Sequence, residues 1–197
     1  ITVSSVDGTA SQKITIEITG TNDTPTITST SPSNDFSASI AEDTSTVTGQ
    51  LAISDADSGE DKFTVQTADT APTYGTFSIT EAGAWTYALD NTLPTVQALA
   101  VGDTLTDTMT VASKDGSKTE DITVTVTGTN DVPTITFTTG NDAGAVTEDA
   151  ATVTATGTLQ ISDVDAGESK FATATHSGNY GSLQIADTGV WTYTLNN

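Results

Sequence analysis

Cysteine is absent from the 197-residue chain, and histidine occurs only once. Without cysteine there are no disulfides, no thiolate metal site and no cysteine nucleophile. The single histidine, His176, lies beside Ser177 and Gly178 in a stretch typical of a surface loop, so neither a catalytic triad nor a histidine-ligated zinc site is supported. We therefore expect the protein not to be an enzyme.

Positive charge is also scarce, because five lysine and arginine residues stand against 26 aspartates and glutamates, a net charge of -21. Such a chain is repelled by phosphate backbones and by anionic membrane surfaces, so we expect neither nucleic acid nor lipid headgroups as partners, whereas cations are favoured. No apolar run approaches the roughly 20 residues that span a bilayer, and the N-terminus lacks the pattern of a signal peptide. We expect an internal piece of a longer protein.

Threonine makes up about a fifth of the residues, and 35% of the residues are hydrophobic. That apolar content is enough for packed cores, so the charge does not indicate disorder. β-branched residues in alternating patterns favour strands over helices. The sequence therefore predicts an all-β fold.

An internal repeat divides the chain into units of domain size. Residues 20–28 recur at 128–136 and residues 51–60 at 159–168, in both cases about 108 residues later. A period of this length indicates whole domains in tandem, since the coils of a solenoid are much shorter. We expect residues 1–23 to be the last strands of a preceding repeat plus a linker, 24–131 a complete repeat, and 132–197 the first two thirds of the next.

Alternation and turn residues predict seven antiparallel strands in the complete repeat and one turn of helix within 96–101. Asp115-Gly116, like Asp7-Gly8, is interpreted as a tight turn between two strands. The pattern predicts an immunoglobulin-like or cadherin-like sandwich, in which Trp85 and Trp191 pack in the core and are not a platform for sugars. The predicted strands are 25–29, 47–53, 63–66, 77–80, 84–89, 105–113 and 119–127.

Acidic residues gather after the second predicted strand of each repeat. Asp55, Asp57 and Glu60 recur as Asp163, Asp165 and Glu168 in the pattern Asp-x-Asp-x-Gly-Glu. Ca²⁺ binds about six to eight hard oxygen ligands, which alternating carboxylates in a loop can supply, although acidic turns are also commonly just solvated.

Strand direction supplies the context for these loops, because antiparallel strands alternate and so fix which loops share an end of the sandwich. The loop 55–60 then faces the linker with Asn22 and Asp23, while Glu42-Asp43 lies at the opposite end. At that end we expect Asn130 and Asp131 to meet the loop 163–168. The predicted Ca²⁺ ligands are Asn22, Asp23, Glu42, Asp43, Asp55, Asp57, Glu60, Asn130, Asp131, Glu148, Asp149, Asp163, Asp165 and Glu168.

Four motifs occur in a fixed order: Gly-Thr-Asn-Asp-x-Pro, Glu-Asp-Thr or Glu-Asp-Ala, Ile-Ser-Asp-x-Asp-x-Gly-Glu, and Trp-Thr-Tyr. In this combination the chain resembles the VCBS-type, cadherin-like repeats of very large bacterial surface adhesins, which are exported by type I secretion and related to RTX adhesins. The resemblance covers essentially the whole chain. It implies an extracellular extender in biofilm or cell adhesion, whose tandem copies hold a distal binding module away from the cell and are stiffened by Ca²⁺ at their junctions.

Two further expectations concern partners. The alternative function is a repeat that itself binds a glycan or a cell-surface ligand. Residues 1–20 also correspond to strands that the third unit lacks, so we expect head-to-tail strand complementation between copies, in addition to contacts with neighbouring repeats.

Overall fold

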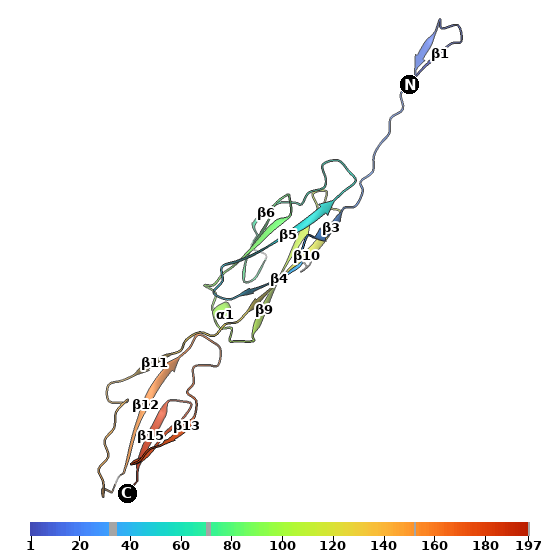
Figure 1. The fold of residues 1–197 in the computed structure, drawn as a ribbon. Coiled ribbons are helices and arrows are strands. Elements are labelled where there is room, and N and C mark those ends of the chain that lie inside the picture. Colours follow the sequence, from blue (N-terminus) through green and yellow to red (C-terminus); the bar gives the residue numbers. More distant parts are fainter. Residues whose placement is uncertain (32–34, 70–71, 152, 197) are drawn as a thin grey trace.

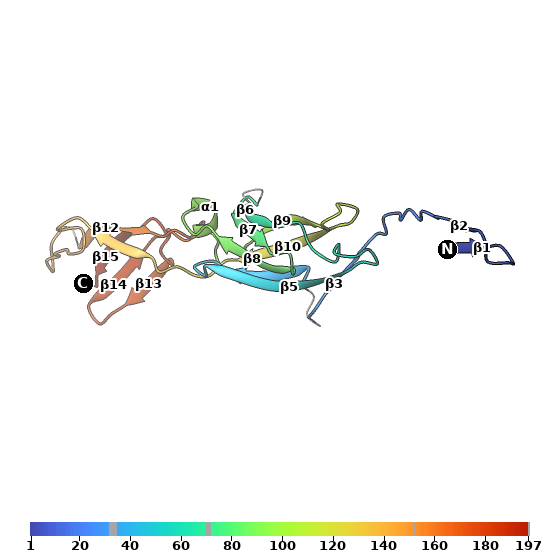
Figure 2. The same ribbon diagram turned by 90° about the horizontal axis from the view of Figure 1, so that it is seen from above.

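The computed structural model describes residues 1–197 except 32–34, 70–71, 152 and 197. The described chain is all-β apart from one short helix, and that helix is neither long nor apolar enough to cross a membrane. An N-terminal hairpin, a central sandwich and a C-terminal sheet follow one another along a long axis (Figures 1 and 2).

The central sandwich consists of two sheets packed face to face. The five-stranded sheet has the order β3-β5-β8-β7-β6, and the three-stranded sheet has the order β4-β10-β9. Helix α1 (Pro94–Gln97) lies between β8 and β9. The strands are β3 (Thr26–Ser29), β4 (Ser37–Ala41), β5 (Thr46–Ser54), β6 (Gln66–Asp69), β7 (Gly75–Ile79), β8 (Ala84–Leu89), β9 (Thr104–Ala112) and β10 (Thr119–Thr127).

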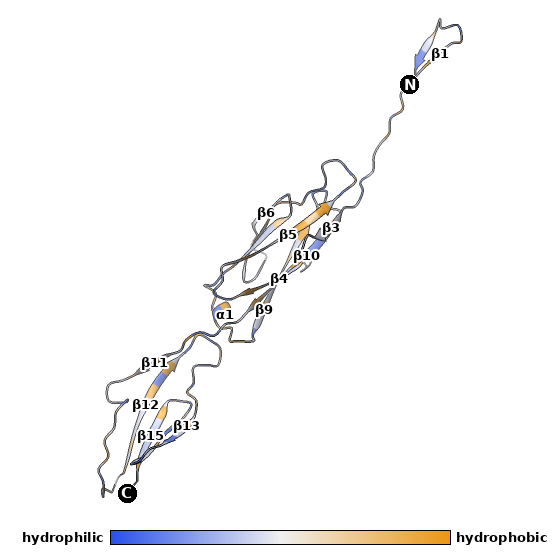
Figure 3. Ribbon diagram, in the orientation of Figure 1, coloured by the Kyte–Doolittle hydropathy of each residue, from blue (hydrophilic) through white to orange (hydrophobic). Residues whose placement is uncertain are grey.

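One continuous core lies between these sheets, and the large residues that alternate along β8 form its centre. Trp85, Tyr87 and Leu89 all point inward and are buried, so the prediction that Trp85 is a core residue is confirmed. Ile122, Val124 and Val126 of β10 face them from the other sheet and are fully buried. Figure 3 shows β5 among the hydrophobic segments. Burial of these alternating side chains is the main force that holds the sandwich together.

Two sequence predictions about strands are wrong. Strand β4 was not predicted, and it pairs in parallel with β10, so the central unit is not purely antiparallel. The predicted strand 63–66 is displaced: Phe63 makes only an isolated bridge to Ser113, and the strand that pairs with β7 begins at Gln66. Phe63 is nonetheless buried.

The C-terminal sheet repeats the strand order of the central five-stranded sheet, as β11-β12-β15-β14-β13. No second sheet covers it within the described residues, and Ile135 is 55% exposed where its counterpart Ile27 is 7% exposed. The inner face of this sheet is therefore open. Its strands are β11 (Thr134–Phe137), β12 (Thr154–Ser162), β13 (Ala174–Ser177), β14 (Gly181–Ile185) and β15 (Val190–Leu195).

The N-terminal hairpin joins β1 (Thr2–Ser4) to β2 (Ser11–Lys13) and is exposed throughout. Its register pairs Thr2 with Lys13, just as Thr110 pairs with Asp121 in the β9–β10 hairpin, one repeat later. The head of the chain therefore folds locally like the end of the central unit.

Candidate metal centres at the two junctions

The first acidic cluster lies between the central unit and the C-terminal sheet, and we call it the lower cluster. It consists of Glu42, Asp131 and Asp165, each of which places one carboxylate oxygen within 4.8 Å of the others. Glu42 directly follows β4, and its N–H donates to the carbonyl of Thr127 at the end of β10. The parallel pairing of β4 thus places Glu42 beside the linker that carries Asp131.

Hydrogen bonds from the backbone hold these carboxylates in place. The N–H of Thr129 donates to Glu42 Oε1 at 2.5 Å, and the N–H of Asp131 donates to Asp165 Oδ2 at 2.8 Å. Asp165 in turn donates its N–H to Asp163 Oδ1 at 2.9 Å. The cluster therefore joins three segments: the end of β4, the linker and the loop after β12.

In the lower cluster, burial and mutual repulsion make it unfavourable for all three carboxylates to be ionised when no cation is bound. Burial raises the pKa of Glu42, and the charges of Asp131 and Asp165 raise it further, against the hydrogen bonds from Thr129. The pKa of Asp131 is raised by desolvation and then by the charges of Asp43, Asp165 and Asp163. A bound cation would remove this repulsion.

The second acidic cluster lies at the opposite end of the central unit, and we call it the upper cluster. It consists of Asp55, Glu60 and Asp115, whose carboxylate oxygens again lie within 4.8 Å of one another. The linker reaches it from above: Asp23 donates its N–H to Asp57 Oδ2 at 2.7 Å, and Asn22 Nδ2 donates to Asp115 Oδ2 at 3.0 Å.

Asp115 is the cluster member that sequence reasoning missed, since Asp115-Gly116 was interpreted only as a turn. It is a turn, but the β9–β10 connection ends on the same side of the sandwich as the loop 55–60. Hydrogen bonds from the side chains of Ser113, Ser117 and Asn22 hold the pKa of Asp115 well below its ordinary value, so it is ionised. Strand direction could have placed it with Asp55.

Unpartnered buried oxygens show that both clusters fit a hard cation. Apart from one atom each of Gln66 and Trp85, all the buried side-chain atoms found without a partner in the described residues are carboxylate oxygens of Glu42, Asp55, Glu60, Asp131, Asp163 and Asp165. Buried polar atoms are nearly always satisfied in proteins. An oxygen-only donor set of this kind suits Ca²⁺.

Several predicted ligands lie outside the two clusters. Glu148, Asp149 and Glu168 are exposed and join neither. Asn130 Nδ2 donates to the backbone carbonyl of Asp131, and Asp43 Oδ1 accepts a hydrogen bond from Gln97 Nε2 at 3.2 Å. The structure therefore brings together part of the predicted set at each junction.

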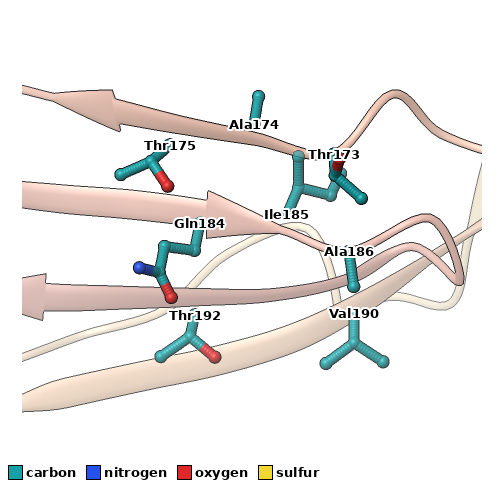
Figure 4. Close-up of a pocket in the computed structure, with 8 residues that line it drawn as sticks. All are labelled: Thr173, Ala174, Thr175, Gln184, Ile185, Ala186, Val190 and Thr192. Carbon is teal, nitrogen blue, oxygen red and sulfur yellow. The ribbon is translucent and has the colours of Figure 1, made fainter.

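A shallow groove lies on the C-terminal sheet. Thr175, Gln184 and Thr192 lie in register across β13, β14 and β15 and line a groove of about 440 Å³ (Figure 4). The residues that line it include no aromatic ring and no charged side chain. It therefore lacks the stacking surface on which sugars commonly bind.

Comparison with known proteins gives a family. Residues 22–128 match the family described as bacterial cadherin-like domain. Among solved structures, the chain is similar to a protocadherin gammaB7 EC3-6 cis-dimer (19% identity, 89% of this chain, 40% of that chain, TM-score 0.47) and to human CDH23 EC21-23 (19%, 96%, 60%, 0.45). The chain thus spans less than two thirds of either structure. No curated protein matches it.

Proposed function

This chain belongs to the family of bacterial cadherin-like domains, and we propose that it is a structural extender of a bacterial cell-surface adhesin, stiffened by Ca²⁺ at its junctions. The role is mechanical and not catalytic. The tandem units provide the length of the extender, and the bound cation determines the stiffness of each junction.

The observation that carries the proposal is the placement of the unpartnered oxygens. They gather at the two ends of the central unit, where it meets the linkers, and the lower cluster draws its members from both sides of the junction. A cation bound there by Glu42, Asp131 and Asp165 would connect the central unit, the linker and the following loop. Cation binding and junction order would then be linked.

The wider context follows from the resemblance. We propose repeat boundaries near residues 24 and 131, and a place in a VCBS-type, RTX-related adhesin that is exported by type I secretion and acts outside the cell in adhesion or biofilm formation. Glu168, the counterpart of Glu60, is a proposed ligand at the lower junction, and Glu148 and Asp149 are proposed ligands of a further junction of the same kind.

Calorimetric titration of the chain with Ca²⁺, and separately with Mg²⁺, tests the metal. We expect saturable Ca²⁺ binding, with at least one site lost in Asp165→Asn and none lost in Asp187→Asn, an exposed aspartate of the same unit. Absence of Ca²⁺ binding in the parent chain at millimolar concentration, the range typical of extracellular sites, would overturn the proposal.

Small-angle scattering tests stiffness apart from binding. In EDTA the interdomain distance distribution should be broad, and Ca²⁺ should narrow it. Asp57→Asn, which weakens the bond from the N–H of Asp23, should loosen the upper junction more than it unfolds the domain. If the interdomain distance distributions are the same with and without Ca²⁺, Ca²⁺ does not stiffen the junctions and the proposed mechanical role is wrong.

Glycan binding by the repeat itself is the alternative function. A spacer should show no saturable sugar binding on a glycan array. Reproducible binding that is lost on changing Gln184, whose side chain lies in the groove of Figure 4, would favour the alternative.

For partners, we propose neighbouring repeats and, between copies of this chain, head-to-tail complementation. Ile14, Ile16 and Ile18 are exposed, whereas their counterparts in β10 are fully buried. Apolar residues also line a groove on the open face of the C-terminal sheet, namely Phe137, Leu159, Leu183, Ile185 and Trp191. Deleting residues 1–19 should abolish concentration-dependent association in light scattering, and a parent chain that is monomeric at every concentration would contradict the proposal.

A further inference from the structure

The segment that follows α1 lies at the lower junction, and we call residues 98–100 the post-helix segment. It is anchored from within, because Val96 and Leu99 belong to the buried core of the central unit. The turn is closed by bonds from the N–H of Ala98 to Pro94 and from the N–H of Leu99 to Val96. The segment is therefore a firm part of the central unit.

Three successive carbonyl groups of this segment face the junction. The carbonyl of Ala98 accepts the N–H of Ala166 at 3.1 Å, across the boundary between the units. The carbonyls of Leu99 and Ala100 lie against Gly128, where an added Cβ would stand 2.5 Å and 2.2 Å from them. The segment thus touches both the start of the linker and the loop of the next unit.

The contact uses no charge and no cation. Ala166 directly follows Asp165, so the bond from Ala166 to Ala98 fixes the same loop that supplies a carboxylate to the lower cluster. Without a cation, the carboxylates of Glu42, Asp131 and Asp165 repel one another and push the units apart. A neutral backbone hydrogen bond beside them opposes that separation.

The upper junction supplies an internal comparison. Ser58 occupies the position of Ala166 in the homologous loop, and Gly20 occupies the position of Gly128. Within the described residues the N–H of Ser58 has no partner, and a Cβ added at Gly20 would meet nothing within 4 Å. Ser58 and Gly20 therefore serve as reference positions that lack both contacts in the described chain.

We propose that the post-helix segment is a docking surface for the loop 163–168 of the following unit, which sets the orientation of the lower junction before any cation binds. Docking keeps Asp165 near Glu42 and Asp131 in the metal-free chain. The junction is then a restrained joint in the absence of cation and not a free hinge.

Amide hydrogen exchange, followed by NMR on the full chain in EDTA, tests the contact directly. The protection factor of the Ala166 N–H, which corrects the exchange rate for residue type, should exceed that of the Ser58 N–H by about 2–10-fold, the range expected for one backbone hydrogen bond. Equal protection factors for the two amides would overturn the proposal. The comparison needs no variant, so a failure to fold cannot obscure it.

Distance measurements test the consequence. Because the chain has no cysteine, spin labels at Thr48→Cys on β5 and Thr156→Cys on β12, both exposed, report the orientation of the two units. In EDTA, Ala166→Pro, which removes the N–H donor, should broaden the distance distribution, and the matched Ser58→Pro should not. Equal distributions for the parent chain and Ala166→Pro would refute docking. Since all measurements are in EDTA, they stand even if the chain binds no Ca²⁺.

Discussion

Replacing Glu42 by glutamine should lower the stability of the protein in the presence of Ca²⁺ but not in its absence. Glutamine keeps an oxygen that accepts the N–H of Thr129, and it removes the charge that faces Asp131 and Asp165. The pKa of Glu42 is raised in the folded chain, so at neutral pH its charge is less favourable there than in the unfolded chain. In EDTA the variant should therefore melt at the parent's temperature or above it.

With Ca²⁺ the same change removes a ligand. Extracellular sites have dissociation constants of about 0.1–1 mM, so at about 10 mM Ca²⁺ an occupied cluster adds roughly 1.5–3 kcal/mol by mass action. For a domain of about 100 residues, 1 kcal/mol shifts Tm by about 4 °C, which gives roughly 6–12 °C per cluster. Because the central unit carries a cluster at each end, Glu42→Gln should lose about half of the Ca²⁺-dependent rise.

Differential scanning calorimetry in EDTA and in 10 mM Ca²⁺ measures both effects, at a Ca²⁺ level about 10–100-fold above the expected dissociation constants. Glu17→Gln is the control, because Glu17 is exposed, lies outside both clusters and is not among the predicted ligands. It should keep the full Ca²⁺-dependent rise. If Glu42→Gln keeps that rise as well, or if the control loses as much, Glu42 is not a ligand.

Three further predictions concern a glycine of the linker, a buried hydrogen bond of the core and the turn of the N-terminal hairpin. Gly128→Ala forces a methyl group against two carbonyls and should cost about 1–3 kcal/mol in urea unfolding, whereas the matched Gly20→Ala should stay within about 0.5 kcal/mol. Tyr87→Phe removes the 2.6 Å bond to the buried carboxylate of Asp107 and should lower the unfolding free energy by about 1–3 kcal/mol; an unchanged value would mean that Asp107 finds another donor. Bonds from Ser5 and Thr9 lower the pKa of Asp7 from 3.8 to about 2, so the turn is favoured above pH 3.8 and loses this support as the pH falls towards 2; an NMR titration midpoint near 4 would contradict this.

The strands that the sequence predicted well are those in which large apolar residues alternate. Along β8 the residues Trp85, Tyr87 and Leu89 mark one face unambiguously, and the β9–β10 hairpin has a similar alternation around an Asp-Gly turn. Strand β4 offers only Ile40 as a large apolar residue among small ones. Its strand character comes from parallel pairing with β10, a contact between distant segments that no local pattern contains.

The candidate site was predictable to the extent that strand direction fixes the ends of a sandwich. Strand direction predicts Asp23 at the end of the sandwich that carries Asp57, and Glu42 at the end that meets Asp165, and the structure has both pairs close together. Asp115 was not predicted as a ligand, because the Asp-Gly turn already had a sufficient local explanation. The hydrogen bond from Ala166 to Ala98 could not be predicted, because it joins two backbone groups. Almost every residue has the same backbone groups, so no sequence pattern indicates this contact.

The ligands of the lower cluster come from both sides of its junction, and this distribution has a mechanical consequence. Glu42 belongs to the central unit, Asp131 to the linker and Asp165 to the loop of the following unit. The lower cluster therefore exists only while the central unit and that loop are aligned. By linkage, whatever aligns the units raises the cation affinity there, and the neutral contact of the post-helix segment provides that alignment.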